Sequence, residues 1–195
     1  MKSVKIIIIA ILCVTLICGG YYLFSQNNVV SEQSLTEVEK VLVKDLKKDY
    51  PKTPREVIKF YNRIVKCYYG EKLSNRELQD MTEQMLCLLD EDLLVVNPSD
   101  EYFKSVVADI NAYSRENKRI VNTDVCDSND VIYVDDVKDG ANEVDKLAYV
   151  NASYFINTDG KFTNTYQQFV LRQDEDGCWK ILTFYEVEGV SEEDD

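Results

Sequence analysis

The chain has no histidine among its 195 residues, and this absence limits its chemistry. Histidine is the usual general base near neutral pH and the commonest metal ligand, so mechanisms of the Ser-His-Asp and Cys-His kind are excluded. What remains is the chemistry of carboxylates and phenols, because 35 acidic residues accompany 13 tyrosines. In an apolar pocket an Asp can act as a base while a Tyr donates a hydrogen bond to the oxyanion.

Asp109 and several tyrosines are the candidates for such a pair. The phenols at helical or strand positions are Tyr61, Tyr149, Tyr154, Tyr166 and Tyr185. No acid stands at an inward strand position, since Asp124 neighbours Asn122 and Thr123 in a run that we expect to face solvent. The pattern favours a protein without catalytic residues, and an enzyme that uses an Asp/Tyr pocket is the alternative.

Aromatic side chains could also line a binding cleft. Clefts for apolar or sugar-like ligands are commonly lined by such side chains, and the same spacing also produces an ordinary core. The candidate lining residues are Tyr61, Tyr154, Trp179 and Tyr185. The sequence does not identify the ligand.

Residues 124–143 contain the acidic side chains that a calcium site would need. Asp127 and Asn129 match the first two ligand positions of an EF-hand loop, but Val131 occupies the third and no glycine follows it. We therefore predict a solvated acidic edge and no bound metal. The glycine-rich motifs of phosphate and dinucleotide sites are absent, so no cofactor is predicted.

Four cysteines lie outside the apolar N-terminal run, namely Cys67, Cys87, Cys126 and Cys178. They allow three disulfide pairings, and the sequence does not choose among them. Each stands at an apolar position of its segment, so buried free thiols are an equal expectation. The formal net charge of −13 repels nucleic acid, which we exclude as a partner.

Residues 6–24 carry no charge and almost no polar atom. Such a run is about as long as a bilayer-spanning helix, which needs ~20 residues at ~1.5 Å each. Lys2 and Lys5 precede it, and the next positive charge is Lys40, so the positive-inside rule places the N-terminus in the cytoplasm. The sequence predicts a single-pass protein of the cell membrane, anchored through residues 6–24, with an extracytoplasmic C-terminal domain. Cleavage or acylation of the anchor stays open.

The predicted organisation has four parts. Residues 1–24 form the cytoplasmic end and the transmembrane anchor, 25–33 a tether, 34–189 an extracytoplasmic α+β domain and 190–195 an acidic tail. Capping boxes at Ser34, Thr53 and Ser74 open three predicted helices, the first ending before Tyr50, and Asn97-Pro98 opens a fourth. Strands are predicted at 120–125, 131–134, 147–156, 162–173 and 178–187. In the last strand, Trp179, Ile181, Thr183 and Tyr185 are expected to share one face.

Helices followed by an antiparallel meander predict an α+β fold in which helices pack on one face of a curved antiparallel sheet. The segment from Gly177 to Ile181, after a long hairpin, resembles the closing strand of nuclear transport factor 2-like (SnoaL-like) domains. The helices that begin at Pro54 and Asn75 suit the opening helical pair of that cone-shaped fold. The stretch from Tyr50 to Ile181 also resembles an uncharacterised family of membrane-anchored or lipoprotein-like chains from Gram-positive anaerobes, which implies no known activity.

The functional prediction is a non-catalytic binding or assembly module at the membrane, with a small ligand or a protein partner in the cell envelope. Two alternatives stay open. One is an enzyme of the ketosteroid-isomerase type with an Asp/Tyr pocket, which the resemblance to the cone fold implies. The other is a sensor or regulator of the envelope.

Overall fold

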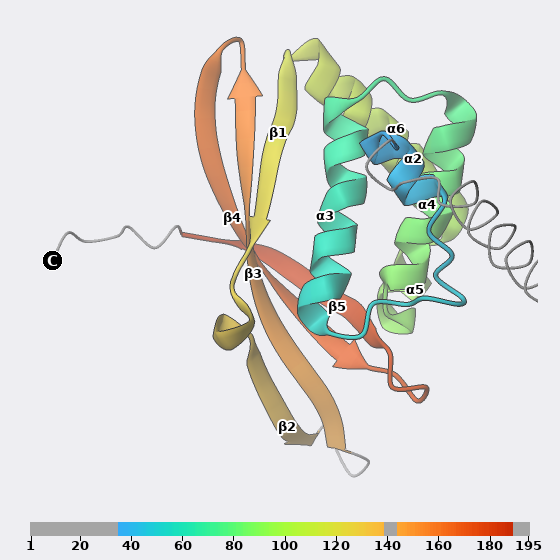
Figure 1. The fold of residues 1–195 in the computed structure, drawn as a ribbon, viewed down its shortest axis with the longest axis vertical. Helices are drawn as coiled ribbons and strands as arrows, with labels where there is room; N and C mark the ends of the chain where they lie inside the picture. The colour runs from blue at the N-terminus through green and yellow to red at the C-terminus, as the bar shows by residue number, and fades with distance from the viewer. Residues whose placement is uncertain (1–34, 139–143, 189–195) are drawn as a thin grey trace, which may run out of the picture. The chain divides into compact units, whose positions relative to one another are not determined.

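The computed structural model describes residues 35–138 and 144–188, and within them a group of helices precedes a group of strands. The helices lie together on one side of the sheet, with α3 (Pro54–Gly70) directly against it (Figure 1). These helices and strands belong to the compact unit that begins at Glu37.

The other helices are α2 (Glu37–Leu42), α4 (Asn75–Leu88), α5 (Glu91–Val96) and α6 (Ser99–Arg115). Two predicted capping boxes are confirmed. The Thr53 hydroxyl accepts a hydrogen bond from the Glu56 amide at 3.2 Å, and the Glu56 carboxylate accepts one in return from the Thr53 amide. Ser74 and Glu77 repeat this arrangement at the start of α4, so each helix has its first free amides satisfied.

Two features of the helical part differ from the prediction. α2 ends at Leu42 instead of continuing toward Tyr50, and the predicted cap at Ser34 lies outside the described residues. α5 was not predicted. Asp90 caps it by accepting a hydrogen bond from the Asp92 amide at 3.0 Å, and its six residues are too few to show a helical repeat.

Every predicted strand is present, within a few residues of its predicted bounds. The strands are β1 (Lys118–Val125), β2 (Ile132–Lys138), β3 (Val144–Thr158), β4 (Lys161–Gln173) and β5 (Trp179–Val187). All of these pairs are antiparallel, in the order β1-β3-β4-β5. The long strand β3 pairs with β1 along its second half and with β2 along its first half. The sheet that results twists strongly and bends around α3 (Figure 1).

A two-residue turn sets the register of the longest hairpin. Thr158 and Lys161 are the last paired residues, and Asp159 and Gly160 between them have φ values of 51° and 81°. Positive φ at both central positions is typical of the type I′ turn, whose twist suits antiparallel strands. The predicted turn at 157–160 is thereby confirmed, and it fixes which β3 residues face the helices.

The core lies between α3 and the inner face of the sheet. Its largest fully buried side chains include Ile58, Ile64, Phe169, Leu171 and Ile181. The rings of Tyr61 and Phe169 meet edge to face, with centroids 5.1 Å apart. The positively polarised edge of one ring against the negative face of another is a favoured aromatic contact, and here it joins α3 to β4.

A β-bulge divides β5 into two parts, and the alternation of side chains between the two sheet faces is reversed from one part to the other. Val170 pairs with Thr183 and Leu171 with Ile181, so Leu182 is an extra residue in β5. Because side chains alternate along a strand, one extra residue exchanges the faces beyond it. The predicted common face is therefore wrong past Ile181, and Phe184 takes the inner position that was predicted for Tyr185.

The transmembrane part of the predicted fold class requires correction. None of the helices in the stretches 35–138 and 144–188 combines the length and apolar character needed to cross a bilayer. Residues 6–24, where the anchor was predicted, lie outside the described part of the chain, as do the tether at 25–33 and the tail at 190–195. The fold class is restated as α+β alone, and the predicted single-pass location in the cell membrane is withdrawn with the anchor.

Candidate ligand-binding site

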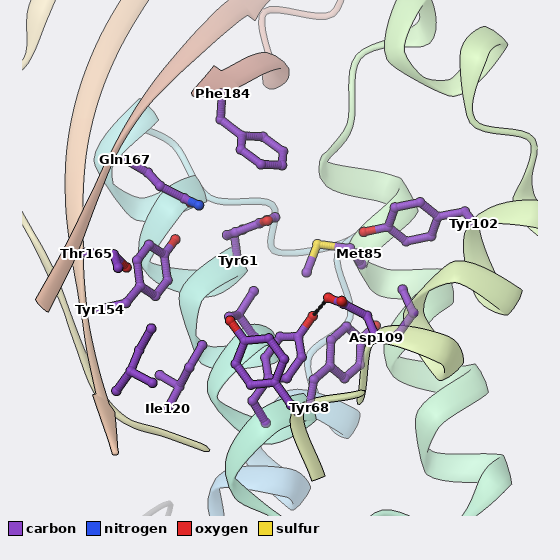
Figure 2. Close-up of a pocket in the computed structure, with 15 residues that line it drawn as sticks. Tyr61, Tyr68, Met85, Tyr102, Asp109, Ile120, Tyr154, Thr165, Gln167 and Phe184 are labelled. Atoms are coloured by element: carbon purple, nitrogen blue, oxygen red, sulfur yellow. Dashed lines mark hydrogen bonds between the residues drawn. The ribbon is translucent and has the colours of Figure 1, made fainter. Parts of the chain in front are cut away.

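A cavity of about 230 Å³ lies between the helices and the inner face of the sheet. Residues of α3, α4 and α6 form one side of it, and residues of all strands except β2 form the other (Figure 2). Its volume is below the ~300–1,000 Å³ of pockets for drug-sized ligands, so it suits a small molecule or one end of a larger one.

Helical spacing brings the lining residues of α6 to one face. Tyr102, Val106, Asp109 and Tyr113 follow one another at intervals of four, three and four residues. The apolar part of the lining comes from several elements: Val65, Met85, Val106, Ile120, Ile156 and Phe184. An acid thus occupies a helical face that otherwise carries aromatic and aliphatic side chains.

Asp109 is held by a phenol from the neighbouring helix. Tyr69 Oη in α3 donates a hydrogen bond to Asp109 Oδ2 at 2.5 Å (Figure 2). Burial and this hydrogen bond raise the pKa of Tyr69 far above its usual value, so the phenol keeps its proton. The ring of Tyr113 lies against that of Tyr69, with centroids 4.3 Å apart, and so fixes the orientation of the donor.

Two further hydroxyls point into the cavity without a protein partner. Tyr61 projects from α3 and Tyr102 from α6, and their hydroxyl ends face the same space (Figure 2). Neither hydroxyl forms a hydrogen bond with any residue that the structure describes. Burial raises the pKa of Tyr102 to about 12 and that of Tyr61 well above 10, so both phenols are neutral near pH 7.

Other tyrosines at the cavity are fixed by buried partners. Tyr154 Oη donates to Asn62 Oδ1 at 2.7 Å. Tyr68 Oη lies 3.1 Å from Thr82 Oγ1, and the Thr82 proton goes to the Leu78 carbonyl, so Tyr68 is the donor. These bonds leave Tyr154 and Tyr68 as rigid wall, in contrast to the unpartnered hydroxyls of Tyr61 and Tyr102.

The structure brings together part of the predicted set. Tyr61, Tyr154 and Asp109 line the cavity. Trp179 is buried elsewhere, with its ring 5.8 Å from that of Tyr133. Tyr185 is 46% exposed on the outer face, where its hydroxyl donates to Gln168 Oε1. The phenols at 149 and 166 do not line the cavity either.

Sequence reasoning missed Tyr69, Tyr102, Gln167 and Phe184, which also line the cavity. The signal that could have found Tyr102 is its spacing of seven residues from Asp109 on one helical face. Gln167 and Phe184 can be assigned to the cavity only when the strand register is known. For Phe184 that register depends on the bulge at Leu182, which has no clear sequence signature. Tyr69 required knowledge of how α3 and α6 pack.

A second hollow, of about 370 Å³, lies between α4 and α6. Its lining includes Thr82, Glu83, Asp100 and Lys104, together with Phe103. Acid and base occur together in this hollow, and Thr82 already binds Tyr68 and the Leu78 carbonyl.

Neither metal ligation nor a disulfide defines a site in the described residues. No group of three or more Cys, Asp or Glu side chains within 35–138 and 144–188 is arranged to hold a metal ion. The four cysteines of this part of the chain are free, so the structure contains none of the three disulfide pairings that the sequence left open. Residues 139–143 of the acidic stretch lie outside the described part.

Fold and site together define an α+β domain with a tyrosine-lined cavity between its helices and its sheet. The chain belongs to the family DUF6715, a domain of unknown function, which matches residues 1–184. A comparison with curated proteins finds no match. The family assigns no enzymatic activity.

Proposed function

We propose that the domain is a non-catalytic binding module whose small ligand occupies the cavity between α3, α6 and the sheet. The observation that carries the proposal is the pair of unpartnered hydroxyls, those of Tyr61 and Tyr102, which point into one cavity beside a carboxylate. Both hydroxyls keep some contact with solvent, so water can hydrate them until a ligand with matching donors or acceptors displaces it.

The surroundings of these groups support the same proposal. Tyr154 and Tyr68 are held by hydrogen bonds to Asn62 and Thr82, so the wall that α3, α4 and the sheet form keeps its shape before a ligand enters. A preformed site loses little conformational entropy on binding. The resemblance of residues 177–181 to the closing strand of nuclear transport factor 2-like domains also favours a ligand at the mouth of a cone. The protein partner predicted from the sequence stays a prediction.

An enzyme of the ketosteroid-isomerase type is the second candidate, and the carboxylate of Asp109 in the cavity favours it. In such a mechanism a phenol donates a hydrogen bond to the oxygen of the substrate, and Tyr61 or Tyr102 could do so. Asp109, however, already accepts a hydrogen bond from Tyr69 at 2.5 Å, and it is exposed rather than enclosed by apolar groups. These two facts favour binding over proton abstraction.

The binding proposal can be tested with a library of small organic molecules and the full chain, by saturation-transfer NMR. Thr165→Phe places a larger side chain in the cavity, whereas Asn164→Phe adds the same group to the opposite face of the same strand. We expect ligands that bind the wild-type chain and the Asn164 variant but not the Thr165 variant. The proposal would be contradicted if the ligands bound both variants as well as the wild-type chain, or if no molecule of the library bound the wild-type chain.

A further inference from the structure

We propose that the ligand is a cation, and that the cavity binds the protonated amino group of a small primary amine with Asp109 as its counter-charge. This inference rests on the proposed function, because it assigns the chemical class of the ligand for the same cavity. It follows from the charge, the hydrogen-bond acceptors and the aromatic rings of the lining.

The charge of the lining is negative. Among the described residues that line the cavity, Asp109 alone is charged. No described lysine or arginine forms an ion pair with it. An anionic ligand would be repelled by this carboxylate and by the net charge of −13, while a cation would be attracted.

The acceptors suit an ammonium group. The carboxylate of Asp109 receives one hydrogen bond from Tyr69, and an ionised carboxylate has about four acceptor positions. The hydroxyl oxygens of Tyr61 and Tyr102 can each accept one more, and they face the same space as the carboxylate (Figure 2). A primary ammonium has three donors and no acceptor, so these three side chains match it in number and in kind.

The aromatic rings add to the attraction. Cations are attracted to the faces of tyrosine rings. Lys118 Nζ already lies 5.6 Å from the ring centroid of Tyr113, so an ammonium group of this chain approaches the same aromatic cluster from outside the lining. Lys118 is paired with Glu116 at 2.9 Å, and it leaves Asp109 without a cation.

The test is a calorimetric titration of the full chain with n-butylammonium chloride, 1-butanol and sodium butyrate, which share one alkyl chain. Because Asp109 is exposed, its ion pair with an ammonium group should make butylammonium bind about 2- to 5-fold more tightly than butanol, and butyrate should bind least. The difference should shrink as salt is added.

Variants then assign the effect to one residue. Asp109→Asn keeps an acceptor for the Tyr69 hydroxyl, so the fold should be retained. The variant should bind butylammonium with about the same affinity as butanol. Glu101→Gln removes an equal charge from an exposed position of the same helix that lines neither hollow, and it should leave the affinity unchanged.

Equal binding of butanol and butylammonium, or no effect of Asp109→Asn, would overturn the assignment of an amine and leave the binding module standing. The same holds if butylammonium fails to bind while the library yields other ligands for the cavity. If neither the three probes nor the library yields a ligand, the proposed function fails as well.

Discussion

Replacing Tyr154 by Phe should destabilise the domain by more than one ordinary hydrogen bond. Tyr154 Oη donates to Asn62 Oδ1 at 2.7 Å, and Asn62 is only 1% exposed. The Asn62 Nδ2 atom already has no partner among the described residues. Tyr154→Phe would therefore leave the whole buried amide unpaired, at a cost of about 1–3 kcal/mol.

The opposite substitution should cost less. Asn62→Leu keeps the branching at Cγ and removes the unpaired Nδ2, while the Tyr154 hydroxyl borders the cavity and can be hydrated there. We expect a loss of about 0–1 kcal/mol. In the double variant both polar groups are gone, so its stability should be close to that of the wild type, and the coupling energy should be about 1–4 kcal/mol.

Equilibrium unfolding in urea measures all four members of this cycle. For a chain of this size, a destabilisation of 1 kcal/mol lowers the Tm by about 2–4 °C, so thermal unfolding provides a second readout. If the costs of the two single substitutions simply add in the double variant, the Tyr154–Asn62 hydrogen bond makes no measurable contribution to stability. An Asn62→Leu variant less stable than Tyr154→Phe would refute the role given to the unpaired amide.

Three further outcomes are expected. Arg172→Met should cost about 3–5 kcal/mol in denaturant unfolding, because it leaves the Asp90 carboxylate, whose side chain is 3% exposed, without its bidentate guanidinium; a loss below 1 kcal/mol would contradict this. Iodoacetamide at mildly alkaline pH should label exposed Cys87 but not Cys67, whose burial raises its pKa to about 11; peptide mass spectrometry would show equal labelling if this is wrong. Burial raises the pKa of several tyrosines, Tyr61 and Tyr69 among them, so the folded state keeps protons that the unfolded chain loses above about pH 10. Stability should therefore be full below about pH 10 and fall as the pH rises further, and a flat denaturant-midpoint profile from pH 8 to about pH 11 would count against it.

Local chemistry explains which parts of the fold could be predicted. The caps at Thr53 and Ser74 and the turn at Asp159-Gly160 depend on residues within four positions of one another, and all were predicted correctly. α5 was missed because one and a half turns carry no visible periodicity, although Asp90 at its start is a good cap.

The site was harder to predict because it depends on packing between distant segments. Asp109 and Tyr61 were identified as candidates by residue type and position. The Tyr69–Asp109 hydrogen bond joins residues 40 positions apart, and no local pattern reports it. Tyr185 was misplaced because one bulged residue, Leu182, reverses the strand face after it.

The two helices that border the cavity are anchored very unequally. α3 has ten buried residues, whereas α6, of the same length, has one, Val106. A helix that buries so little can separate from its neighbours at low free energy, so α6 should open locally while the sheet and α3 stay closed. Its amide hydrogens should then exchange with deuterium well before those of α3, and a small molecule would reach the interior by the same transient opening.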